Sequence, residues 1–144
     1  SNTIGINNSA FGHYALLNNT TGANNTAVGA SSLRANTEGC FNTALGNSAL
    51  AANTTADRNT AVGMSALLST TTGCCNTSIG QGTMSANTTG DNNVAVGTLA
   101  LTTNTTADNN TAIGYNALTA NTTGTRNNAF GAYALYNNTI VELW

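Results

Sequence analysis

Few side chains in this sequence could perform acid–base or nucleophilic chemistry. The chain has 144 residues with one histidine, His13, and three cysteines. A hydrolytic site needs a nucleophile, a base and an orienting group that converge. Nothing in the spacing brings a serine, cysteine or carboxylate to His13. We interpret this histidine, which precedes Tyr14, as a cap or surface residue. We predict that the protein is not an enzyme and uses no cofactor.

The carboxylates offer a weak candidate for metal binding. Asp57, Asp91 and Asp108 share one position of a repeating sequence unit, and Asp91 and Asp108 belong to successive units, so they would lie on neighbouring coils if the units stack. Carboxylate oxygens suit calcium, but the glycine- and aspartate-rich nonapeptide of calcium-binding rolls is missing. We therefore favour a solvated edge, and Asp91 and Asp108 remain the candidates for a metal site.

The cysteines do not predict a disulfide within the chain. Cys40 and Cys74 share one column of the repeat but lie two units apart. Coils ~4.8 Å apart would separate them by roughly 9.6 Å, beyond the ~7 Å limit between disulfide-bonded Cα atoms. Cys75 follows Cys74 directly and makes the count odd. We expect buried free thiols, with interchain sulfurs as the alternative.

A seventeen-residue unit, repeated eight times without insertion or deletion, would position all of these side chains. Its pattern is N-N-T-A-V-G-x-x-A-L-x-x-N-T-T-G-x, and unit positions are numbered here from the first Asn. Such regular spacing predicts one coil repeated along an axis. Residues 1–144 then form a single repeat domain. Residues 1–6 are a degenerate partial repeat, 7–139 hold the eight units with the last incomplete, and 140–144 are a C-terminal cap or the start of a next segment.

Four unit positions carry the structural predictions. Position two is always Asn and position six is always Gly, and both columns are expected to be structural ladders. The ladder residues are Asn8, Asn25, Asn42, Asn59, Asn76, Asn93, Asn110 and Asn127, with Gly12, Gly29, Gly46, Gly63, Gly80, Gly97, Gly114 and Gly131. Positions five and ten are large and apolar, and we expect both to form the core. The core residues are Val28, Leu33, Leu45, Leu50, Val62, Leu67, Ile79, Met84, Val96, Leu101, Ile113 and Leu118.

The unit predicts an all-β fold, a parallel β-solenoid or β-roll with one repeat per coil and about eight coils. N-T-A-V-G is expected to be a short strand, x-A-L-x a second strand and N-T-T-G a turn. The alternative is a strand with one helical turn, since Ala-Leu favours helix. A unit this short leaves little room for that helix and its caps.

The amino-acid composition excludes some classes of binding partner. Only 6% of residues are charged and Lys is absent, so no basic footprint for nucleic acid exists. No stretch reaches the ~20 apolar residues of a membrane span, so no membrane insertion is predicted, and no signal peptide is visible. One coil buries about two large apolar side chains, which barely offsets the entropy of ordering it. We therefore expect other copies to contribute, with Leu17, Leu68 and Leu99 as candidates for an interchain seam.

The repeat resembles a known family. Ala27-Val28-Gly29, Ala61-Val62-Gly63 and residues 112–117 are similar to the head repeats of trimeric autotransporter adhesins. The full unit, as in residues 110–124, is also similar to repeats of bacteriophage tail-fibre proteins. The resemblance implies a left-handed parallel β-roll of three chains wound side by side and serving in surface attachment. No binding residues carry over, because the matching positions are structural.

These observations favour a structural and adhesive rod belonging to a surface adhesin, a tail fibre or an extracellular filament. It would act by multivalent surface contacts and by self-assembly as a homotrimer or end-to-end filament. The expected location is extracellular, on a cell surface or on a virion tail fibre, with a host-surface glycan or receptor as partner. The alternative is an ice-binding (antifreeze) β-solenoid that uses Thr and Asn ladders. Against it, Thr20, Thr37 and Thr54 fall in a predicted corner, whereas a flat ice face favours T-x-T on a strand.

Overall fold

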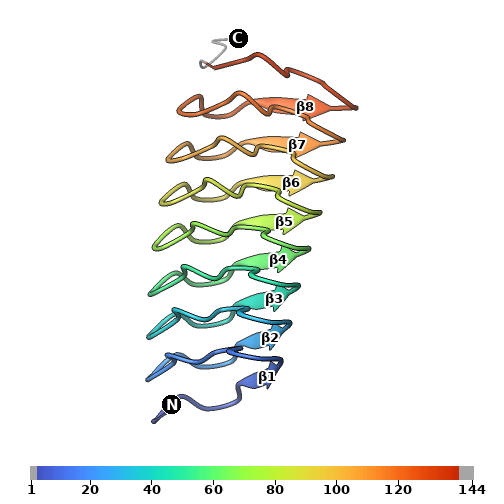
Figure 1. Ribbon diagram of the computed structural model, residues 1–144. Helices are drawn as coiled ribbons and strands as arrows, with labels where there is room; N and C mark the ends of the chain where they lie inside the picture. The colour runs from blue at the N-terminus through green and yellow to red at the C-terminus, as the bar shows by residue number, and fades with distance from the viewer. Residues whose placement is uncertain (1–2, 140–144) are drawn as a thin grey trace.

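The computed structural model describes residues 3–139. Over this range the chain winds into one stack of near-identical coils, and the strand of each coil lies directly over the strand of the coil before it (Figure 1). Residues 3–139 contain no helix. The predicted all-β parallel solenoid with one repeat per coil is therefore confirmed, and the alternative with a helical turn in each unit is wrong.

Each unit contributes one short strand to a single parallel sheet in sequence order. Neighbouring strands pair with a shift of one unit, so that Ala27 lies opposite Ala44 and Val28 opposite Leu45. The strands are β1 (Ser9–Phe11), β2 (Thr26–Val28), β3 (Thr43–Leu45), β4 (Thr60–Val62), β5 (Thr77–Ile79), β6 (Val94–Val96), β7 (Thr111–Ile113) and β8 (Asn128–Phe130). Thr, Val and Ile suit this conformation because branched side chains pack well on a pleated surface. Each strand ends at the position-six glycine, whose φ lies between 115° and 137°.

The segment x-A-L-x does not form the second strand that the sequence predicts. Positions eight and ten have positive φ in every unit, for example 56° at Ser48 and 51° at Leu50. Successive side chains of a strand point to opposite faces, whereas Ala49 and Leu50 are both fully buried. The left-handed residues turn the chain so that two successive apolar side chains enter the core.

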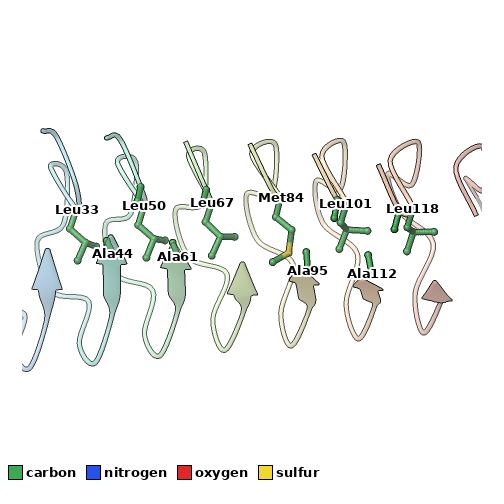
Figure 2. Close-up of a cluster of buried hydrophobic side chains, with 14 of the residues drawn as sticks. Leu33, Ala44, Leu50, Ala61, Leu67, Met84, Ala95, Leu101, Ala112 and Leu118 are labelled. Carbon is green, nitrogen blue, oxygen red and sulfur yellow. The ribbon is translucent and has the colours of Figure 1, made fainter. Parts of the chain in front are cut away.

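The core is a row of leucines that faces the alanines of the strands (Figure 2). The position-ten side chains lie in the interior, where the sequence analysis expected them. Those with no exposed surface are Leu33, Leu50, Leu67, Met84, Leu101 and Leu118. Met84 occupies the same place in its coil as the leucines do in theirs, because its flexible thioether side chain adapts to the available space.

The other half of the expected core, at position five, is wrong. These side chains lie on the outer surface of the sheet. They are Val28 (38% exposed), Leu45 (41%), Ile79 (41%) and Ile113 (37%), with Val62 and Val96 half-buried. The strand alternation requires this, since the position-four alanine points inward and its neighbours must point outward. The coil is narrow, and the leucine row leaves room opposite it only for a small side chain, which is alanine in every strand except β5, where it is Ser78.

The first described residues continue the stack. The main-chain N–H groups of Thr3, Ile4 and Gly5 all donate to the carbonyl of Thr20, at 3.0–3.3 Å. In later units this arrangement belongs to positions fourteen to sixteen, so these residues are the end of a preceding unit in correct register. The predicted cap or new segment at 140–144 lies outside the described residues.

Candidate functional site

One regular surface is the outer sheet face, which we define as the side chains at positions three and five of β1–β8. Position three supplies Ser9, Thr26, Thr43, Thr60, Thr77, Val94, Thr111 and Asn128, and position five supplies Phe11, Val28, Leu45, Val62, Ile79, Val96, Ile113 and Phe130. Side chains two residues apart on a strand are ~6.8 Å apart and neighbouring coils are ~4.8 Å apart. The face is therefore a grid of two columns, one mainly hydroxyl-bearing and one apolar.

The outer sheet face carries no charged side chain between Ser9 and Phe130. A surface of this kind neither attracts ionic ligands nor repels an identical copy. Its chemistry is limited to hydrophobic contact along position five and hydrogen bonding along position three.

The three leucines proposed as an interchain seam do not form one row. Leu17 and Leu68 occupy position eleven three units apart, and Leu99 occupies position eight. Leu68 lies in a shallow depression that is also lined by Arg34, Ala35, Ala51, Ala52 and Ser69. The continuous apolar column is the one at position five.

The position-two asparagines form a buried ladder that joins each coil to the next. Asn25 is fully buried. Its Oδ1 accepts the main-chain N–H of Asn42 at 2.9 Å, and its Nδ2 donates to the carbonyl of Gly39 at 2.8 Å. The Oδ1 bond recurs along the column up to Asn127. The partners are mainly backbone groups rather than neighbouring amides, so the column stabilises a corner of the coil.

A second buried ladder at position thirteen was missed by the sequence analysis. Asn36 donates from Nδ2 to Oδ1 of Asn19 at 2.7 Å and to the carbonyl of Gly39 at 3.0 Å. Thr70 replaces Asn in this column and donates its hydroxyl to the carbonyl of Asn87 at 3.2 Å. The buried Oδ1 of Asn53 then has no hydrogen-bond partner. The signal was visible in the sequence, since N-T-T-G begins with Asn in nearly every unit.

The position-fourteen threonines direct their hydroxyls into the stack. The hydroxyl of Thr20 donates to the carbonyl of Thr37 at 2.9 Å, and the same oxygen accepts the N–H groups of Thr20, Thr21 and Gly22. The hydroxyl of Thr37 repeats this contact with Thr54. The position-fourteen hydroxyls therefore donate to main-chain carbonyls and do not form an outward-facing array of free hydroxyl groups.

The aspartates at unit position seventeen, which we call the aspartate column, also accept hydrogen bonds from main-chain N–H groups. Asp91 accepts the N–H of Cys74 at 2.7 Å, and Asp108 accepts the N–H of Asp91 at 2.8 Å, each through Oδ1. Asp57 accepts the N–H of Cys40 at 2.6 Å. Within residues 3–139 no three His, Cys, Asp or Glu side chains gather closely enough to hold a metal ion. Asp91 and Asp108 thus lie on adjacent coils, and each already holds a main-chain group.

The cysteines are free thiols and partly exposed, not fully buried as expected. Cys40 occupies the aspartate column, and its Sγ accepts the N–H of Ala23 at 3.3 Å. The Sγ atoms of Cys74 and Cys75 lie 3.1 Å apart, a proximity that the sequence analysis did not consider.

Aromatic side chains gather near both ends of the described stack. The exposed rings of His13 and Tyr14 have centroids 3.6 Å apart in the first coil. Tyr133 contacts Tyr115 and Tyr136 edge to face, with centroids at 5.3 and 5.6 Å. These contacts extend over the outside of the terminal coils.

Comparison with family models, curated proteins and solved structures gives no match for this chain. Among residues 3–139, no helix is present that is long and apolar enough to cross a membrane.

Proposed function

We propose that this chain is a rod segment of a non-enzymatic structural or adhesive fibre built from several copies of itself. The observation that carries the proposal is the outer sheet face, which presents a half-exposed apolar side chain in coil after coil of an otherwise closed fold. Contiguous exposed apolar surface of this kind is typical of interaction sites.

The geometry of the column favours a second copy as its partner. A row of side chains that repeats every ~4.8 Å packs best against a row with the same repeat, and another copy supplies it. In a parallel homotrimer, three outer sheet faces would turn toward one axis, and equivalent coils would meet at the same level. A face roughly 38 Å long and ~10 Å wide is small compared with the ~800 Å² per partner of stable interfaces. We therefore expect concentration-dependent association.

Light scattering across a concentration series tests this assembly. The wild-type chain should form a trimer, whereas Val62→Lys with Ile79→Lys should be monomeric, because the new ammonium groups would be desolvated in the interface. Thr72→Lys with Thr89→Lys adds the same charge at exposed positions of the same two coils and should leave the trimer intact. A wild-type chain that stays monomeric throughout contradicts the proposal.

We further propose that the rod lies outside the cell, on a surface or a virion tail fibre, where it binds a host-surface glycan or receptor. The support for this location and these partners is the resemblance of the repeat to adhesin and tail-fibre repeats. Multivalent display raises apparent affinity by about 10²–10⁴. On a glycan array the trimer should therefore be retained, and the monomeric Val62→Lys/Ile79→Lys chain should be lost. Equal retention of the two would contradict multivalent adhesion.

Ice binding is the second candidate, and one observation favours it. Thr occupies position three in five of the six strands β2–β7, beside the apolar column on the outer sheet face. These strand threonines, each two residues before Val, Leu or Ile, are distinct from the corner threonines, whose hydroxyls donate to main-chain carbonyls.

Thermal hysteresis separates the two candidates. An ice-binding monomer should show a freezing-point gap that Thr60→Lys on the outer sheet face abolishes and Thr72→Lys in the same coil leaves unchanged. A clear gap with this mutational pattern would displace the fibre proposal, and no gap would remove ice binding.

A further inference from the structure

Two adjacent thiols lie at the corner of the solenoid that precedes β5. Cys74 is the last residue of one unit and Cys75 the first of the next. The two thiols share a hydrogen bond, with 3.1 Å between the two sulfur atoms. Both side chains are free and partly exposed to solvent.

The neighbouring coils hold the backbone of this pair from both sides. The N–H of Cys74 donates to Oδ1 of Asp91 at 2.7 Å, and the N–H of Cys75 donates to the carbonyl of Asp57 at 3.1 Å. The φ of Cys75 is 62°, a left-handed value shared by its whole column. The backbone that carries the two thiols is therefore held by the coil rather than belonging to a flexible loop.

We propose that Cys74 and Cys75 form a two-sulfur binding site for a trivalent, thiophilic metalloid centre, of which an organoarsenic(III) compound is the simplest example. With bonds of about 2.3 Å to a shared atom, two sulfurs 3.1 Å apart subtend an angle of roughly 85° at it. Tetrahedral zinc requires about 109°. A trivalent arsenic atom keeps a lone pair, and its three bonds form a pyramid with angles near a right angle.

The binding step balances without an oxidant. Phenylarsine oxide reacts with the two thiols so that two S–H bonds and the arsenic–oxygen bond break and two As–S bonds form. The oxygen leaves as water with both thiol protons, and arsenic remains trivalent.

Cys74 carries its proton before the binding step. The hydrogen bond with Cys75, followed by burial and the nearby Asp91 carboxylate, raises the pKa of the Cys74 thiol to about 12. At neutral pH Cys74 is therefore a protonated thiol, which reacts slowly with alkylating agents. The binding step removes this proton in the water that leaves, so the raised pKa slows the reaction without changing its stoichiometry.

The test is the intact mass of the full chain after treatment with phenylarsine oxide and then excess monothiol. The wild-type protein should retain one adduct, heavier by the reagent less one water, and should lose it to a dithiol. Cys74→Asp and Cys75→Asn place at each site a residue that the same column holds in other units, so both variants should fold. Each should retain at least tenfold less adduct.

Cys40→Asp is the matched control, because it removes a thiol of the same column as Cys74 and leaves the pair. It should retain the adduct as the wild type does, with circular dichroism verifying the fold of all variants. Loss of the adduct in Cys40→Asp, or retention in Cys75→Asn equal to wild type, would overturn the proposal. Neither result depends on the oligomeric state of the rod, so the test is independent of the proposed fibre function.

Discussion

At the scale of single residues, this coil depends on conformations that most side chains disfavour. Within residues 3–139, left-handed backbone occurs at 23 non-glycine residues, including every position-ten residue, with φ between 46° and 53° there. Such a conformation costs about 1–2 kcal/mol for a residue with a Cβ atom. It persists because hydrogen bonds from the coils on both sides specify it and because it directs Leu into the core.

Replacing Ser65 by Gly should stabilise the protein by about 0.5–1 kcal/mol. Ser65 has a φ of 58° at position eight, where the fifth unit already carries Gly82. Glycine removes the left-handed strain, which outweighs its extra chain entropy. Ser69→Gly, in the same coil but outside the left-handed positions, should destabilise instead. Urea denaturation of both variants checks the pair, and equal effects would contradict the strain argument.

Replacing Thr70 by Asn should complete the position-thirteen ladder. The new Nδ2 can donate to the buried Oδ1 of Asn53, which has no partner in the wild-type chain. Satisfying that group should raise the free energy of unfolding by about 1 kcal/mol. The reverse change, Asn104→Thr, would reproduce the gap elsewhere and should lower it by a similar amount. The denaturation midpoints of the two variants measure these changes in stability. A Thr70→Asn chain that is less stable than the wild type would show that the missing partner of the Asn53 Oδ1 does not destabilise the fold.

At the scale of the element, each three-residue strand is defined by its end and by its neighbours. A strand of this length has no independent stability, and its pairing in register with the strands above and below holds it in place. The position-six glycine follows the strand directly, at a point where the backbone of the next coil approaches closely. A Cβ atom at Gly63 would lie 2.5 Å from the carbonyl oxygen of Gly80.

Gly63→Ala should therefore destabilise the fold by about 3 kcal/mol or more, because the backbone contact adds to the strain of a φ of 130°. Gly131→Ala is the comparison, since a Cβ atom there would meet nothing within 4 Å. That variant should show the conformational cost alone, about 1–2 kcal/mol. Thermal unfolding followed by circular dichroism gives both values, and equal losses would exclude close coil packing as the cause.

At the scale of the whole molecule, the stack is a one-dimensional array in which every coil contacts only its neighbours. The sheet runs from β1 to β8 in strict sequence order, with contacts only between successive strands (Figure 1). Stability in such arrays is approximately a sum over repeats and their interfaces. The outer sheet face gains length with each coil, so the surface available for assembly grows in proportion to the stack.

Deleting residues 58–74, one complete unit, should leave a folded and shorter rod, because every remaining column stays in register. The expected result is an unchanged circular dichroism spectrum per residue with a reduced free energy of unfolding. Deleting only residues 58–66 would shift Leu and Asn out of their columns and should abolish cooperative unfolding. A whole-unit deletion that unfolds the chain would contradict the independence of the coils.

Much of this architecture follows from the repeat by itself. A strict period, kept from unit to unit without insertion, forces each residue to lie over its equivalent. Parallel stacking, the glycine corners and the asparagine ladders follow from that constraint alone. The period does not specify which way each side chain points within a coil. The larger residue at position five was therefore assigned to the interior that the position-four alanine occupies.

Only the tertiary structure decided the direction of the side chains and the distances between columns. Left-handed backbone at positions eight and ten turns Ala49 and Leu50 inward together, which no alternation rule predicts. The Leu row then fills the narrow interior and leaves the Val and Ile column facing outward. The 3.1 Å between the sulfurs of Cys74 and Cys75 likewise follows from no feature of the sequence period. Sequence period determines what stacks, whereas the path of the chain around one coil determines what is buried.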